Sequence, residues 1–69
     1  MDEGELEVYI NLHNCNSARF ILGKLLVEGS NDKIKKNVIK GVNWLKEAIK
    51  NGNVDALEFK AYYDIRYDK

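Results

Sequence analysis

Apolar residues recur at helical spacing in four segments of this 69-residue chain, and clusters of Asn, Ser and Gly separate the segments. The first segment predicts a helix from about Asp2 to His13, and the second predicts one that begins in the cluster Asn14–Ser17 and ends at Gly29. The Asn and Ser side chains of that cluster are expected to cap the second helix. The residues expected to face inward in these helices are Leu6, Tyr9, Ile10 and His13, then Ala18, Ile21, Leu22, Leu25 and Leu26.

The second half of the chain has the same arrangement. A polar loop or helical turn is expected from Ser30 to Lys36, after which Asn37 would cap a third helix that ends at Asn51-Gly52. Asn53 would cap the fourth helix, and so short a connection requires antiparallel neighbours. The inward residues expected in the third helix are Val38, Val42, Leu45, Ala48 and Ile49, with Trp44 on its flank. Those expected in the fourth are Ala56, Leu57, Ala61 and Ile65.

The segment Glu7–His13 admits a second interpretation. Val8, Ile10 and Leu12 alternate with polar residues, as they would in a half-buried strand. A single strand would have no partner in this chain, and isolated strands are not stable. Helix is therefore the preferred prediction, and the chain is expected to be all-α.

The chain also matches itself after a shift of 38 residues. The shift carries Leu6 onto Trp44, Ala18 onto Ala56, and other small residues onto one another, which suits helices that cross closely. The match predicts a single domain over residues 1–69. Its parts would be helix B of a preceding unit in 1–14, one A–B unit in 15–52, and a capping helix A in 53–69.

This pattern resembles that of the Sel-1-like repeats, which are relatives of the tetratricopeptide repeats. The residues that carry the resemblance are Ala18, Leu22, Gly23, Leu26, Gly29, Asn37, Lys40, Gly41, Trp44, Leu45, Ala48, Gly52 and Ala56. Asn37 and Gly41 stand where the family has Asp and Ala, and the match weakens at Lys60 and Asp64. The resemblance implies a short right-handed α-solenoid of about four helices, in antiparallel pairs, that lacks catalytic residues and holds other proteins together.

The net charge of the chain adds little to this picture, but the positions of the charged residues add more. Eleven basic and eleven acidic residues give no net charge, which favours neither a nucleic-acid nor a membrane partner. Acidic residues crowd the N-terminus, whereas Lys33–Lys40 is rich in lysine and is the segment best suited to phosphates. Because lysine-rich loops are ordinarily solvated, nucleic-acid binding there is the less favoured alternative. Without a membrane span or a disulfide, the chain is expected to be intracellular and cytoplasmic.

His13 and Cys15 are the residues that could suggest catalysis or metal binding. A structural zinc site needs four ligands, and this chain has one His and one Cys. Residues two apart at a helix end do not face each other, so a Cys–His nucleophile pair is not expected. We therefore expect no enzyme activity, metal or cofactor, ordinary packing for Cys15, and a helix-terminal role for His13.

The expected function is a non-catalytic protein-interaction or scaffold module, part of a longer repeat array, that binds a protein or peptide partner. The candidate contact residues, on the second and fourth helices, are Arg19, Lys24, Glu58, Tyr62, Tyr63 and Tyr67. The alternative is a regulatory or substrate-docking segment of a larger enzyme. Because stacks of fewer than two complete units are marginal, self-association through exposed end helices is also expected.

Overall fold

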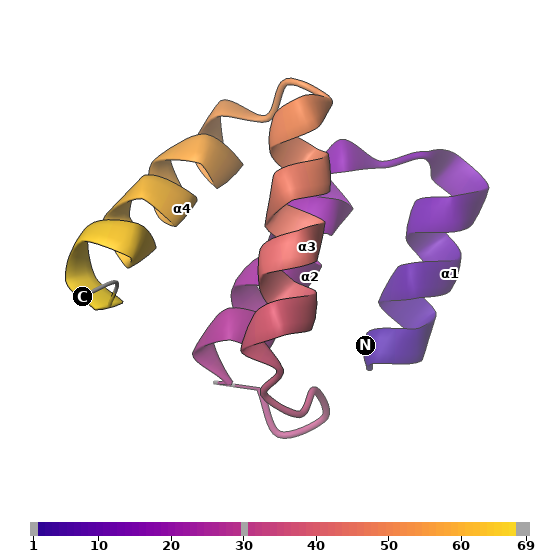
Figure 1. The fold of residues 1–69 in the computed structure, drawn as a ribbon. Helices are drawn as coiled ribbons and strands as arrows, with labels where there is room; N and C mark the ends of the chain where they lie inside the picture. The colour runs from indigo at the N-terminus through magenta and orange to yellow at the C-terminus, as the bar shows by residue number, and fades with distance from the viewer. Residues whose placement is uncertain (1, 30, 68–69) are drawn as a thin grey trace.

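The structure is a computed structural model that describes residues 2–29 and 31–67, with side chains as far as residue 64. Within these ranges the chain forms four helices and no strands: α1 (Glu3–His13), α2 (Asn16–Glu28), α3 (Val38–Lys50) and α4 (Val54–Tyr67). Successive helices run in opposite directions, and α1 and α4 lie on opposite sides of a central α2–α3 pair (Figure 1). The all-α prediction is confirmed, and Glu7–His13 is helix rather than strand.

Most helix boundaries follow from local capping chemistry. The Oδ1 atom of Asn37 accepts a hydrogen bond from the backbone N–H of Lys40 at 3.0 Å, and that of Asn53 accepts one from Ala56 at 2.8 Å. Each bond satisfies a donor that the first turn of a helix leaves unpaired, so both predicted caps are confirmed. Helix α2 ends at Gly29, whose φ of 65° is the left-handed conformation that glycine adopts without steric cost.

The cap predicted for α2 is wrong. Cys15 occupies the N-cap position, and its side chain makes no capping hydrogen bond. Asn16 lies inside the helix and instead donates from Nδ2 to the carbonyl oxygen of Ala48, 3.0 Å away in α3. Asn16 therefore links the start of α2 to the end of α3 by a hydrogen bond.

Two glycines allow α2 and α3 to touch backbone to backbone. A Cβ atom built on Gly23 would lie 2.9 Å from the carbonyl oxygen of Gly41, and one built on Gly41 would lie 2.8 Å from that of Gly23. A Cβ on Gly41 would also approach the backbone nitrogen of Val27 to 2.9 Å. Since these neighbours are backbone atoms, neither position can accept a side chain unless the helices move apart.

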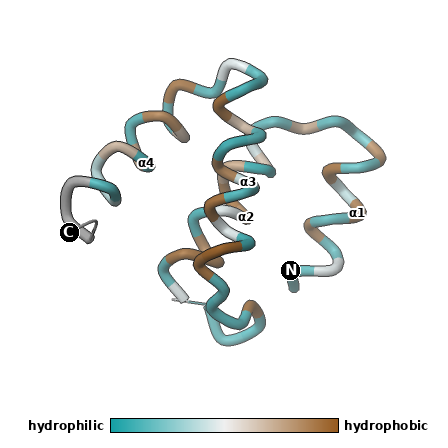
Figure 2. Tube along the Cα trace, in the orientation of Figure 1, coloured by the Kyte–Doolittle hydropathy of each residue, from teal (hydrophilic) through white to brown (hydrophobic). Residues whose placement is uncertain are grey.

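Hydrophobic side chains pack in two clusters, one including α1 and the other including α4, and Figure 2 shows hydrophobic segments along the α2–α3 pair between them. The first cluster contains Leu6, Ile10, Ala18, Leu22, Leu26 and Ile34. The second contains Val27, Leu45, Ala48 and Ala56, with Phe20, Val42, Ile49, Phe59 and Tyr63 packed against it. Ile34 is buried although it lies in the segment that was expected to be a polar loop.

The inward faces predicted for α1 and α2 need correction. Leu6 and Ile10 of α1 are buried, but Tyr9 and His13 are exposed. Of the residues predicted to face inward in α2, Ile21 is exposed. Helix α2 contacts all three other helices, so most of its circumference is covered and its apolar residues do not form a single face.

The inward face predicted for α4 is largely wrong. Ala56 is buried, but Leu57 and Ala61 are exposed, and the side chain of Ile65 lies outside the described residues. The residues of α4 that pack against the core are Phe59 and Tyr63. These two lie three and seven positions after Ala56, the spacing of one helix face.

Substitution of Gly41 by alanine tests the α2–α3 contact. We expect Gly41→Ala to lower the free energy of unfolding by about 2 kcal/mol, although alanine is by itself the better helix former by roughly 1 kcal/mol. The control is Gly4→Ala in α1, where a Cβ atom would meet only the Oδ1 atom of Asp2, at 3.6 Å. Urea denaturation followed by circular dichroism measures both. A Gly41→Ala protein as stable as the wild type would contradict the close contact.

Candidate functional site

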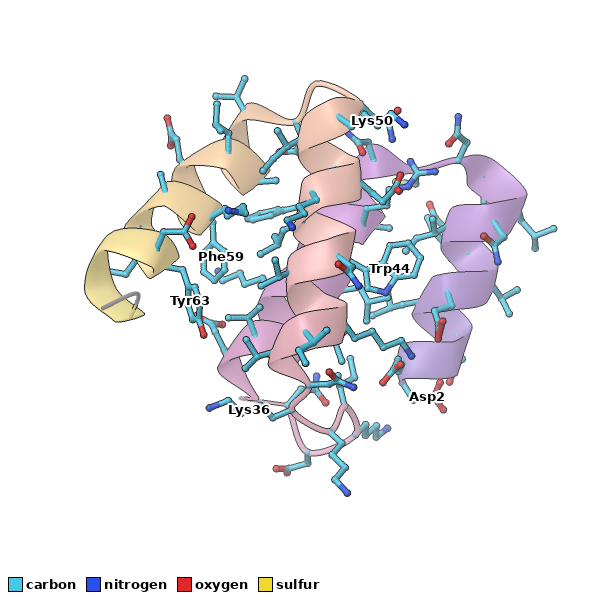
Figure 3. The ribbon with its side chains drawn as sticks, viewed as in Figure 1. Asp2, Lys36, Trp44, Lys50, Phe59 and Tyr63 are labelled. Atoms are coloured by element: carbon cyan, nitrogen blue, oxygen red, sulfur yellow. The ribbon has the colours of Figure 1, made fainter. Side chains whose placement is uncertain are left out.

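A small groove lies between α2 and α4. It has a volume of about 240 Å³, and its lining residues are Val27, Glu28, Lys36, Phe59, Tyr62 and Tyr63. Figure 3 shows Phe59 and Tyr63 pointing from α4 toward the central helices. Because α2 and α4 border the groove on opposite sides, residues far apart in the sequence meet there.

Aromatic side chains form one wall of this groove. The rings of Phe59 and Phe20 meet edge to face, with centroids 6.1 Å apart, which is a favourable arrangement for aromatic pairs. The Nζ atom of Lys24 lies 5.9 Å from the centroid of the Phe59 ring, within reach of a cation–π interaction. Tyr62 is 58% exposed and lies beside Tyr63 at the groove. The wall therefore combines the ring of Phe59, which packs against Phe20, with the exposed ring of Tyr62.

Two charged residues, Lys36 and Glu28, line the groove close to the turn after α2. The side-chain stem of Lys36 lies against Gly29, where an added Cβ would come within 2.7 Å of the Cβ of Lys36. Glu28 lies one residue before this turn and also lines the groove. Lys36 and Glu28 therefore place one cation and one carboxylate at the groove, and Lys24 lies over the Phe59 ring beside it.

The structure brings together only some of the predicted contact residues. Tyr62 and Tyr63 line the α2–α4 groove, and Lys24 lies beside it, over the ring of Phe59. Arg19 lies elsewhere: its Nη2 atom donates a hydrogen bond to Oδ1 of Asn14 at 2.7 Å, and it lines a surface between α1 and α3. Glu58 is exposed on α4 without lining the groove in the described part of the chain, and the side chain of Tyr67 lies outside it.

Sequence reasoning missed Phe59, Val27, Glu28 and Lys36 as members of this site. The spacing of Phe59, Tyr62 and Tyr63 places three aromatic rings on adjoining positions of one helix face, and this was the available signal. Lys36 could not have been found in the same way, because only the turn at Gly29 brings it to the groove.

The residues that carry the resemblance to Sel-1-like repeats lie either between packed helices or at turns. Ala18, Leu22 and Ala48 are buried, as are Gly23 and Ala56. The half-buried Trp44 packs against the cluster that includes α1. Gly29 and Gly52 both have positive φ values, of 65° and 91°.

The lysines of Lys33–Lys40 do not act as one patch. Lys40 forms ion pairs with two carboxylates of α1, Glu3 and, at 3.6 Å, Glu7. The hydrogen bond to Glu3 and the charge of Glu7 raise the pKa of Lys40 above its ordinary value. Lys36 borders the α2–α4 groove. Lys36 and Lys40, two of the lysines that could bind a phosphate, therefore lie in different surroundings.

His13 and Cys15 do not form a site with each other. The ring of His13 contacts that of Tyr9, with centroids 4.6 Å apart, and Cys15 packs half-buried against the cluster that includes α1. Among residues 2–29 and 31–67, no three His, Cys, Asp or Glu side chains are grouped so as to hold a metal ion. None of the helices described has the length and apolar character needed to cross a membrane.

Comparison of the chain with protein-family models, with curated proteins and with solved structures finds no match. The resemblance to Sel-1-like repeats accordingly remains an interpretation of the residue pattern.

The ion pairs of Lys40 are expected to help hold α1 against the central pair. Both partners are partly exposed, with 40% of the Lys40 side chain and 26% of the Glu3 side chain accessible, so we expect Lys40→Met to cost no more than about 1 kcal/mol of unfolding free energy. Lys46→Met, which removes an exposed lysine of the same helix, is the control. A double-mutant cycle with Glu3→Gln separates the pairing from other effects.

The same comparison at different pH values checks the sign of the pKa shift. The folded-state pKa of Lys40 is raised, so its contribution is fully present below the unfolded pKa of about 10.4 and is lost as pH rises through the folded value. The stability difference between wild type and Lys40→Met should therefore persist from neutral pH to about pH 10 and disappear above it. A difference that persists unchanged in strong alkali would contradict an electrostatic role.

Proposed function

We propose that this chain is a non-catalytic interaction module whose α2–α4 groove binds a short segment of a partner protein. The observation that carries the proposal is the convergence of Phe59, Tyr62 and Tyr63 with Lys36 in one groove, beside which Lys24 lies over the Phe59 ring. Exposed aromatic residues next to cations are frequent anchors of protein interfaces.

The size of the groove indicates what kind of segment would fit. Ligand pockets that enclose a whole small molecule have volumes of roughly 300–1,000 Å³, and this groove has about 240 Å³. It can therefore hold one or two side chains, but not a helix. The partner would insert a large apolar side chain and leave the rest of its segment on the surface.

The charges at the groove indicate the chemistry beside that side chain. Lys36 and Glu28 are the charged residues among the described residues that line the groove, and the Nζ atom of Lys24 lies beside it, over the Phe59 ring. A carboxylate next to the inserted side chain would be attracted there. We therefore propose a peptide with an aromatic or leucine-like residue beside Asp, Glu or a free C-terminus.

The helices that form the groove are equivalent under the 38-residue shift. The shift carries Asn16, the first residue of α2, onto Val54, the first residue of α4. We interpret the four helices as antiparallel pairs stacked in a short right-handed solenoid, as in the Sel-1-like repeats. Repeat proteins use the surface formed by successive equivalent helices to bind partners, and the groove lies on such a surface.

Both end helices carry charges where stacking of a further unit would require apolar or small residues. Lys60 and Asp64 stand on α4 at the positions of the buried Leu22 and Leu26 of α2, and they form an ion pair of 2.8 Å. On α1, Glu3 and Glu7 correspond to Gly41 and Leu45 of α3. A further unit in the same geometry would bury these charges, which supports a capping role for α4.

Selection of peptide ligands from a displayed library, followed by NMR titration of the labelled protein, tests the groove. We expect selected peptides to carry an apolar residue beside a carboxylate. They should shift the backbone amide signals of α2 and α4 around Lys24, Phe59 and Tyr62. Selection of no peptide, or shifts confined to α1, would contradict the proposal.

Matched variants make the assignment specific. Tyr62→Ser and Lys24→Gln should each weaken binding of a selected peptide by about 5-fold or more, as expected for an anchor residue and for a paired charge. Tyr9→Ser and Lys46→Gln make the same chemical changes away from the groove and should leave the affinity unchanged. Equal effects in both sets would indicate binding without a defined site.

A further inference from the structure

Helix α1 presents an apolar face that no other helix of the described chain covers. Val8 is 56% exposed and Leu12 is 75% exposed, and they lie four residues apart on the same side of the helix. Together with Tyr9 they line a shallow depression that ends at Asp2 and Glu5 on one side and at His13 on the other.

The equivalent face of α3 is polar. The 38-residue shift carries Val8 onto Lys46 and Leu12 onto Lys50, and both lysines are exposed. Helix α3 forms with lysines at these positions, so the helix itself does not require apolar residues there. Single exposed apolar residues are ordinary, but an apolar stripe that replaces lysines on an equivalent helix indicates a partner.

We propose that this face of α1 pairs with the same face of a second copy of the chain, in an antiparallel α1–α1 contact. The charges of α1 divide between two sides. Glu3 and Glu7 pair with Lys40 of α3, whereas Asp2 and Glu5 border the exposed apolar face.

The distribution of charge along this face selects the antiparallel arrangement. Asp2 and Glu5 lie at the beginning of the helix, and His13 lies at its end, where its ring contacts Tyr9. Antiparallel pairing places the carboxylates of one copy beside His13 of the other and opposes the two helix dipoles. Parallel pairing would instead place the carboxylates of both copies together. The antiparallel contact is two-fold symmetric, so it closes as a dimer.

The dimer is expected to be weak and independent of the groove. Two three-turn helices bury less than the roughly 1,200–2,000 Å² of a standard interface, which suggests a dissociation constant on the order of 100 µM. Helix α1 lies on the opposite side of the central pair from α4 (Figure 1), which supplies Phe59, Tyr62 and Tyr63 to the groove. Dimerisation and peptide binding can therefore succeed or fail separately.

Sedimentation equilibrium over a range from about 10 µM to about 1 mM, which brackets the expected constant, tests the dimer. The wild-type protein should dimerise across this range. Val8→Lys/Leu12→Lys, which gives α1 the residues of α3, should weaken the dimer by about 10-fold or more. Leu12→Lys alone, at the more exposed position, should weaken it as well. Circular dichroism confirms that each variant is folded.

Two controls remove exposed apolar residues elsewhere. Ile39→Lys changes a residue of α3 that is 79% exposed, and Leu57→Lys changes an exposed residue of α4; both should leave the dimer intact. A wild-type monomer at about 1 mM, or a dimer that Leu57→Lys disrupts and the α1 variants do not, would overturn the proposal.

Discussion

The contact between Gly23 and Gly41 is the constraint on which the rest of the structure depends. Their close approach brings α2 and α3 together along their length, and hydrogen bonds at both ends of the pair maintain the arrangement. Asn16 donates to the carbonyl oxygen of Ala48 at one end, and the backbone N–H of Asn37 donates to that of Leu26, at 2.9 Å, at the other. The outer helices then pack against a pair whose geometry is already fixed.

This construction leaves much of each outer helix exposed. The chain measures 36 × 28 × 15 Å, so it is a thin layer rather than a sphere. Small domains bury a lower fraction of their surface than large ones, and here α1 and α4 each contact the central pair on one side. The sides that remain are available for binding, and they include the groove beside α4 and the apolar face of α1.

The sequence could predict the features that depend on local chemistry or on spacing alone. These include the caps at Asn37 and Asn53, the end of α2 at Gly29, and small residues where helices cross. It could not predict which face of α4 turns inward, because apolar residues occur around most of that helix and contact with Phe20 decides the outcome. Likewise, the sequence predicts Tyr62 and Tyr63 on the same helix, but their meeting with Lys36 depends on the turn after α2.

Comparison of positions related by the 38-residue shift separates what helix packing requires from what it permits. Ala18 and Ala56 are both buried, as are Ile10 and Ala48, so these positions are constrained by helix crossings. Other equivalent positions differ in chemistry, and the most marked case is Leu12 of α1, which corresponds to a lysine of α3. Since both helices fold, packing does not determine such positions. The differences between positions related by the 38-residue shift therefore support the binding face that we propose on α1.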